Sequence, residues 1–147
     1  MYQHILIPTD GSDLSKQAIH KAVELAKNLG AKVTFFHAAP DYPSTSHGAG
    51  ELMEFMPPQQ YAQLRDEQVR EFLTDAEKTA RTAGVSCAVE SEVRNAPYRG
   101  IVDAAARLHC DLIFMASHGR HGMSGVLLGS ETQKVLTHSK LPVLVYR

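Results

Sequence analysis

Short apolar segments alternate along the chain with longer segments in which apolar residues recur every three or four positions. The short segments at residues 4–8, 32–38 and 112–115 are rich in aliphatic, β-branched or aromatic side chains, which favours strands. Residues 87–93 have the period of a strand with one polar face, and residues 141–146 are apolar again. The pattern therefore predicts five strands.

Four helices are predicted between these strands. In the first, Leu14 and Ala18 begin a helical repeat that continues to Leu29, and Gly30 follows as a C-terminal stop. Gly84 follows the second helix in the same way. The helical segments cover about residues 14–29, 61–83, 95–108 and 130–139, and a long loop is expected from residue 39 to residue 58.

Strands that alternate with helices predict an α/β fold, a doubly wound parallel sheet with helices on both faces and right-handed crossovers. The length of 147 residues fits one domain over residues 1–147. The first and fourth strands are the most apolar of the non-terminal strands and should be central neighbours, whereas the half-polar third strand belongs near an edge. In such a sheet a ligand binds at the carboxyl ends of the strands, where the strand order reverses.

Composition excludes several classes of partner. Lys and Arg number 15 against 16 Asp and Glu, so the net charge is −1 and no basic patch indicates nucleic acid. The N-terminal residues lack the pattern of a signal peptide, and no apolar run is long enough to span a membrane. Two cysteines do not make a disulfide framework and are typical of a reducing compartment. We expect a cytoplasmic protein with neither nucleic acid nor membrane partners.

A glycine-rich connection between the fourth strand and the fourth helix, at residues 116–130, is the most unusual stretch of the chain. Glycines allow close backbone approach to a ligand, and the first turn of a helix offers unpaired N–H groups with partial positive charge. Together they predict an anion site, with phosphate as the usual anion. In the alternative interpretation the glycines only shape a loop, and Ser130 caps the helix in a capping box with Gln133.

Asp10 follows the first strand and so lies at the same edge as the glycine-rich connection. It could accept hydrogen bonds from a ribose, act as a phosphoacceptor or cap the following helix, although Ser12 and Asp13 are also available as caps. A phosphoacceptor needs an acidic cluster and a lysine at another strand end, and the sequence supplies neither. Ribose binding is therefore favoured, and capping can accompany it.

The sequence offers little for metal binding or catalysis. His118 and His121 lie two residues apart with no further obvious ligand, so no metal site is expected. Ser12 or Ser130 with His118 as base would make a hydrolase, but neither serine lies in a Gly-x-Ser-x-Gly elbow. The Walker phosphate loop and the dinucleotide fingerprint are also absent. No catalytic residue is predicted, and any hydrolysis should be slow.

Several motifs of the chain resemble the universal stress protein family, in its nucleotide-binding branch, over essentially the whole length. They are the segment from Ile5 to Ser12, Phe36-His37-Ala38, Ser117-His118-Gly119 followed after nine residues by Gly129-Ser130, and Pro142-Val143-Leu144-Val145. The loop motif of that branch is glycine, two residues, glycine, nine residues, glycine, then serine or threonine. Ala116 stands where its first glycine is expected.

The resemblance implies a Rossmann-like sheet of order 3-2-1-4-5 and binding of ATP or AMP, with Mg²⁺ as a further candidate. It implies that Asp10 lies near the ribose or adenine, that the Ala38 backbone recognises the adenine edge, and that Gly119, Gly129 and Ser130 hold the phosphates. The full set of candidate binding residues comprises Pro8, Thr9, Asp10, Ala38, Met115, Ala116, His118, Gly119, Arg120, Gly129, Ser130, Glu131 and Thr132.

Three functions follow from these expectations. The first is a stress protein that binds an adenine nucleotide and acts as a ligand-dependent regulator or interaction module. The second is a slow ATP-hydrolysing enzyme, and the third is a nucleotide-free interaction protein. The apolar fifth strand is an edge that invites pairing, and family members commonly dimerise through it, so a homodimer is expected. Residues 42–57 are expected to fold over the nucleotide or onto a partner.

Overall fold

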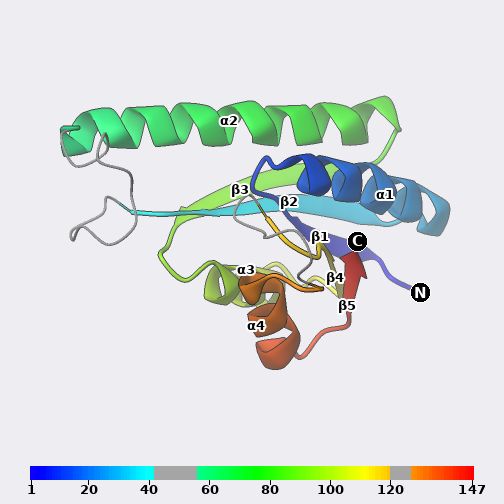
Figure 1. The fold of residues 1–147 in the computed structure, drawn as a ribbon. Coiled ribbons are helices and arrows are strands. Elements are labelled where there is room, and N and C mark those ends of the chain that lie inside the picture. The colour runs from blue at the N-terminus through cyan, green and yellow to red at the C-terminus, as the bar shows by residue number, and fades with distance from the viewer. Residues whose placement is uncertain (42–55, 120–126) are drawn as a thin grey trace.

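In the part of the chain that the structure describes, five parallel strands form one sheet in the order β3-β2-β1-β4-β5 (Figure 1). The computed structural model describes residues 1–41, 56–119 and 127–147. The strands are β1 His4–Pro8, β2 Lys32–Ala39, β3 Cys87–Val93, β4 Leu112–Ala116 and β5 Val143–Tyr146. The predicted order 3-2-1-4-5 is confirmed, with the apolar β1 and β4 as neighbours and β3 at an edge.

Among the described residues, four helices cover the two faces of the sheet, as the doubly wound prediction requires. They are α1 Asp13–Leu29, α2 Pro58–Thr82, α3 Pro97–Arg107 and α4 Ser130–His138. Figure 1 shows α1 and α2 on one face and α3 and α4 on the other. Among the described residues no helix combines the length and the apolarity needed to cross a membrane.

The two faces of the sheet carry separate apolar clusters, because strand side chains alternate between them. Ile5 and Ile7 pack with α1 and α2, whereas Leu6 packs with α3 and α4. All three are fully buried. Strands buried on both faces explain the continuously apolar sequence of β1 and β4.

The second helix begins at Pro58, three residues before the predicted start at Tyr61. Proline fits the first helical position because the N–H that it lacks would have no partner there. The expected loop therefore ends earlier than predicted. The hypothesis that residues 42–57 fold over the nucleotide or onto a partner falls mostly outside the described part of the chain, which omits residues 42–55.

Helix ends agree with the sequence prediction for α1 and correct it for α4. Gly30 ends α1 at a φ of 67°, which glycine adopts without strain. In α4 the N-cap is Gly129 rather than Ser130, and no side chain caps it. The Gln133 amide Nε2 donates to the Leu128 carbonyl at 3.0 Å. The predicted capping box is therefore wrong, since Ser130 is already helical.

The fifth strand starts at Val143, two residues later than predicted. The Ser139 hydroxyl donates to the Leu141 carbonyl and accepts from the Leu141 N–H, both at 3.0 Å, which holds residue 141 in a turn. Pro142 precedes β5, and its carbonyl accepts a hydrogen bond from the Ile113 N–H at 3.0 Å. The strand is thus short, and it forms the edge of the sheet opposite β3.

Candidate functional site

The strand order reverses between β1 and β4. These strands are parallel neighbours, yet the chain leaves β1 for α1 on one face and leaves β4 toward α4 on the other. Loops that depart to opposite faces open a crevice at the carboxyl ends of the two strands, which is where ligands bind in sheets of this kind. The two loops that the sequence singled out therefore lie at this switch point.

The turn after β1 is held by a series of short hydrogen bonds. Thr9 is buried, and its hydroxyl bonds the Ser15 hydroxyl at 2.6 Å. The Asp10 carboxylate accepts from the Ser12 N–H through Oδ1 at 3.0 Å, and the Ser12 hydroxyl caps α1 by accepting from the Ser15 N–H at 3.2 Å. Ser12 is thus the cap of α1, and Asp10 stabilises the turn before it.

His37, near the end of β2, fixes the same turn from the side. Its Nδ1 lies 2.7 Å from the Thr9 carbonyl oxygen. The His37 ring also contacts Phe72 of α2 edge-on, with 4.8 Å between the two ring centroids. His37 is therefore a hydrogen-bonded, packed residue that ties β2 and α2 to the backbone of Thr9.

The Asp10 carboxylate lies directly against Gly119, the third residue after β4. A Cβ atom on Gly119 would collide with Asp10 Oδ2, so only glycine fits while Asp10 keeps its place. This contact brings together two residues that are far apart in the sequence. It places a carboxylate next to a bare stretch of backbone at the switch point.

Gly129, the N-cap of α4, packs on the chain just after β4. Its N–H donates to the Ser117 carbonyl at 2.6 Å, and a Cβ at this position would lie 3.1 Å from His118 Cα. Ser117 itself is buried, and its N–H donates to the Tyr146 carbonyl of β5 at 2.7 Å. The sequence analysis named Ser117 only as part of the Ser117-His118-Gly119 motif and not as a candidate binding residue, although its position directly after a buried strand indicated a backbone that needs partners.

The first turn of α4 has no side-chain cap, and its N–H groups begin at Ser130, next to the Ser117 carbonyl that Gly129 contacts. The exposed Ser130 is the first helical residue. The side chains of the next two residues are engaged elsewhere: Glu131 accepts from the Tyr98 N–H at 2.9 Å, and Thr132 donates to the Ala116 carbonyl at 3.0 Å. Only the backbone of these two residues can therefore face a ligand.

Ala116, where the family motif has glycine, does not line the bare backbone. Its side chain belongs to the apolar cluster that α1 and α2 cover, whereas Met115 belongs to the cluster on the opposite face. An alanine methyl group at residue 116 thus points into the core. The departure from the motif therefore adds a buried methyl group.

Ala38 extends the site along β2. The Lys32 N–H donates to the Gln3 carbonyl, and the Phe36 carbonyl accepts from the Thr9 N–H, so even-numbered residues of β2 direct their backbone toward β1. β1 ends at Pro8, which pairs with Phe36. The Ala38 backbone therefore faces the space beyond the end of β1.

The remaining candidates lie at the rim or outside the described chain. His118 is half-buried, with Nδ1 3.1 Å from the Ser117 hydroxyl. Arg120 and His121 fall outside the described residues. Within residues 1–41, 56–119 and 127–147, no three metal-binding side chains gather in one place.

Comparison with known proteins identifies relatives over the full length. The model of the universal stress protein family matches residues 1–147. The universal stress protein MJ0531 of Methanocaldococcus jannaschii is 32% identical over 150 residues, which cover 100% of this chain and 83% of the relative. The solved structure of the hypothetical protein MJ0577 has a TM-score of 0.82 at 26% identity, and the match covers 99% of this chain and 95% of that one.

Several similar structures contain adenine nucleotides. A universal stress protein in complex with cAMP has a TM-score of 0.70 at 24% identity, covering 99% of this chain and 97% of that one. The Archaeoglobus fulgidus protein in complex with dAMP has a TM-score of 0.71 at 21% identity, with coverages of 99% and 98%. An Arabidopsis thaliana family protein with AMP bound has a TM-score of 0.67 at 16% identity, with coverages of 97% and 90%. At these identities the likeness shows the fold.

Proposed function

Because the chain belongs to the universal stress protein family, we propose that it binds an adenine nucleotide, ATP or AMP, in the crevice where β1 and β4 end. The observation that carries the proposal is the contact between Asp10 and Gly119, where no Cβ atom fits beside the carboxylate. Glycines that admit no side chain are needed where a backbone must approach a ligand closely. The cAMP, dAMP and AMP complexes of similar structures support the same class of ligand.

The chemistry of the crevice orients the nucleotide. A carboxylate accepts hydrogen bonds from ribose hydroxyls and repels phosphate, so the ribose belongs at Asp10. The phosphates belong at Gly119, Gly129 and Ser130, since the uncapped first turn of α4 offers N–H groups and partial positive charge. The backbone of Ala38, beyond the end of β1, would then meet the polar edge of the adenine.

Neighbouring residues complete the proposed site. Pro8, Thr9, Met115, Ala116 and His118 would lie beside the site through their backbone, since the side chains of Thr9, Met115 and Ala116 are buried. Glu131 and Thr132 would contribute backbone N–H groups, and Arg120 would add a cation for the phosphates. With ATP, Mg²⁺ would accompany the phosphates, because their oxygens are the hard ligands that this ion prefers. The arrangement binds and orients a nucleotide, so any hydrolysis would be slow.

The second element of the proposal is a homodimer formed through β5. This edge strand carries Leu144, which is 39% exposed, and Leu136 on the adjacent helix is 42% exposed. An exposed apolar edge strand is a template for pairing with another chain. A dimer that buries both leucines fits a ligand-dependent interaction module rather than an enzyme. We place this dimer in the cytoplasm, where the free Cys87 and Cys110 would stay reduced.

A calorimetric titration of nucleotide-stripped protein with ATP, ADP and AMP tests the proposal. We expect binding in the micromolar range for at least one nucleotide. Gly129→Glu places a bulky anion against His118 and the phosphate position, and it should abolish that binding. A folded native protein that binds none of the three nucleotides would refute the site. Sedimentation velocity would then test separately whether the protein is a homodimer.

A further inference from the structure

A residue of α4 caps the start of α3. The N-cap of α3 is Ala96, whose side chain holds no acceptor, and Pro97 at the first helical position has no N–H. The Tyr98 N–H, the first that the helix offers, donates to Oε2 of Glu131 at 2.9 Å, although the two residues are 33 positions apart. A carboxylate is favourable at a helix N-terminus because of the partial positive charge there. Glu131 thus supplies from another element the cap that Ala96 lacks.

Tyr98 also contacts the far end of α4. The centroid of its ring lies 4.9 Å from that of the His138 ring and 5.6 Å from Lys134 Nζ. Glu131 is the second residue of the nine-residue helix, and His138 is the last. Tyr98 therefore contacts the first turn of α4 through its backbone and the last turn through its ring, and the two contacts set the direction of α4 against α3.

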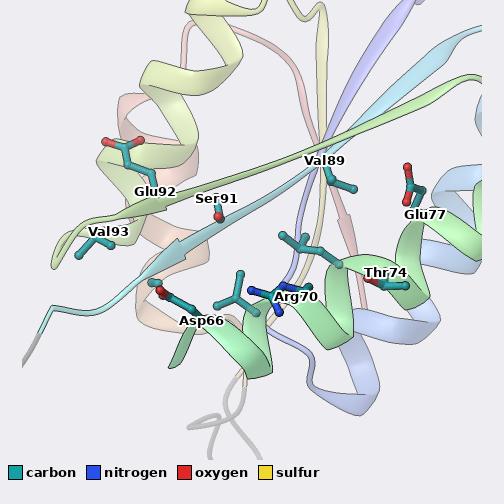
Figure 2. Close-up of a pocket in the computed structure, with 11 residues that line it drawn as sticks. Asp66, Arg70, Thr74, Glu77, Val89, Ser91, Glu92 and Val93 are labelled. Atoms are coloured by element: carbon teal, nitrogen blue, oxygen red, sulfur yellow. The ribbon is translucent and has the colours of Figure 1, made fainter. Parts of the chain in front are cut away.

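The two helices are unequally anchored to the sheet. Two residues of α4 and four of α3 are buried, namely Thr132 and Val135 against Gly100, Ile101, Ala104 and Ala105. Arg94, which follows β3, also contacts Asp103 of α3 at 2.8 Å and Glu92 of the strand at 3.3 Å. Figure 2 shows Glu92 on the side of β3 turned away from Arg70 of α2. α3 is therefore the more firmly held partner, and α4 is the one that a lost contact would release.

The first turn of α4 is also bonded to the end of β4. The Gly129 N–H donates to the Ser117 carbonyl at 2.6 Å, and the Thr132 hydroxyl donates to the Ala116 carbonyl at 3.0 Å. Because the two acceptors belong to neighbouring residues, these bonds act as a hinge about which the helix can tilt. The bond from Glu131 reaches a different element, α3, and it therefore opposes that tilt.

We propose that the Glu131 side chain is a positioning group for the phosphates: by capping α3, it holds the first turn of α4 at the angle at which its N–H groups meet them. The inference rests on the nucleotide site proposed above. Donors that are already held in place lose less conformational freedom when a ligand binds. α3 in turn lies on β2, since a Cβ on Gly100 would be 3.4 Å from Ala38 Cβ. The bond between Glu131 and Tyr98 thereby links the phosphate end of the site to the adenine end.

Calorimetric titration of two matched pairs of proteins with AMP and with adenosine tests this role. The native protein and Glu131→Asp both carry a carboxylate, but aspartate is shorter by one methylene, about 1.5 Å, and falls short of the Tyr98 N–H. Glu131→Gln and Glu131→Ala both lack the charge, but only glutamine keeps an acceptor oxygen at the required reach. Within each pair the shorter side chain should bind AMP about fivefold more weakly. Adenosine, which has no phosphate, should bind both members of a pair equally.

Lys134→Gln is the control for the exposed ion pair. It removes the 3.3 Å contact between Lys134 and Glu131 and leaves the bond to Tyr98 in place, so the affinity for AMP should stay within about twofold. Equal AMP binding within either pair, with AMP bound by the native protein, would overturn the role of Glu131 alone. An equal loss of adenosine binding would also overturn it, because such a loss indicates a general effect on the fold. A native protein that binds no nucleotide would refute the proposed site and, with it, this inference.

Discussion

The Asp10 carboxylate, which follows β1, lies so close to Gly119, which follows β4, that a side chain at residue 119 would overlap its Oδ2 atom. The two residues come from loops that leave the sheet toward opposite faces. Their contact therefore fixes the position of the loop after β1 relative to the loop after β4 in the proposed nucleotide site. A methyl group at residue 119 would move the carboxylate and loosen its bond to the Ser12 N–H.

The first prediction concerns Gly119→Ala. We expect the affinity for AMP to fall about tenfold or more, which corresponds to about 1.4 kcal/mol, because Asp10 must leave its position. The melting temperature should change little, since Gly119 is exposed. Calorimetric titration measures the affinity, and Asp10→Asn, which keeps the size of the side chain, separates the effect of position from that of charge. Native affinity in Gly119→Ala would argue against a ligand at this contact.

The second prediction concerns Ala116→Gly, which restores the glycine of the family motif. The methyl group of Ala116 is buried in the cluster beneath α1 and α2, so its removal should lower the free energy of unfolding by about 1–2 kcal/mol. The affinity for nucleotide should stay within about twofold, because the methyl group does not face the crevice. Urea denaturation and calorimetry together check both parts. A large gain in affinity would show that Ala116 obstructs the phosphates.

The third prediction concerns the two thiols. Burial raises the pKa of the Cys110 thiol to about 11, and the nearby Asp111 raises it further. Only a minute fraction of this thiol is ionised near neutral pH, so it should be inert toward thiol reagents in the folded protein. Cys87 is half-buried at the edge strand, and its Sγ lies 3.9 Å from the Glu77 carbonyl.

A disulfide reagent such as Ellman's should therefore label one thiol of the native protein readily and the other only after denaturation. Cys87→Ser should remove the rapid phase, whereas Cys110→Ser should leave it unchanged. Two equivalents reacting at one rate in the native protein would contradict the assignment.

The fourth prediction concerns His4 and acid stability. Burial lowers the pKa of the His4 imidazole below its usual 6.5, and the charge of Lys32 lowers it further. The folded state then binds fewer protons than the unfolded state at acid pH. The contribution to stability is fully present above the unfolded pKa and is lost as the pH falls through the folded pKa. The bond between His4 Nε2 and Thr34 Oγ1, at 2.8 Å, suits the neutral ring.

Urea denaturation at several pH values from about 7.5 to about 5 checks this sign. The native protein should lose more of its unfolding free energy over this range than His4→Gln, which has no titrating ring. Parallel pH profiles for the two proteins would show that His4 does not contribute to acid sensitivity.

The periodicity of the strands predicted part of the sheet order, whereas the full order 3-2-1-4-5 was implied by the resemblance to the universal stress protein family. The continuously apolar β1 and β4 had to be central, and the half-polar β3 had to lie at an edge. The direction of Ala116 was also predictable, since strand alternation sends Leu112, Phe114 and Ala116 to one face of β4.

Other features of the site depend on partners that are distant in the sequence. Glu131 turns toward the Tyr98 N–H at the start of α3, and Thr132 turns toward the Ala116 carbonyl. Both contacts join residues that are distant in the sequence, so no local sequence pattern predicts them. The N-cap of α4 was misassigned because glycine and serine are adjacent there, and which of them caps depends on how Gly129 bonds to Ser117.

The hydrogen bond from the Gly129 N–H to the Ser117 carbonyl joins the two ends of the connection between β4 and α4 at 2.6 Å. This hydrogen bond therefore joins the end of β4 to the start of α4, whatever the number of residues in the loop between Ser117 and Gly129. Lengthening a closed loop costs little entropy, about 0.6 kcal/mol for each doubling. We therefore expect that segments of different length or chemistry can be exchanged between residues 119 and 127 to alter the preference of the proposed nucleotide site, while the Gly129–Ser117 pair is retained.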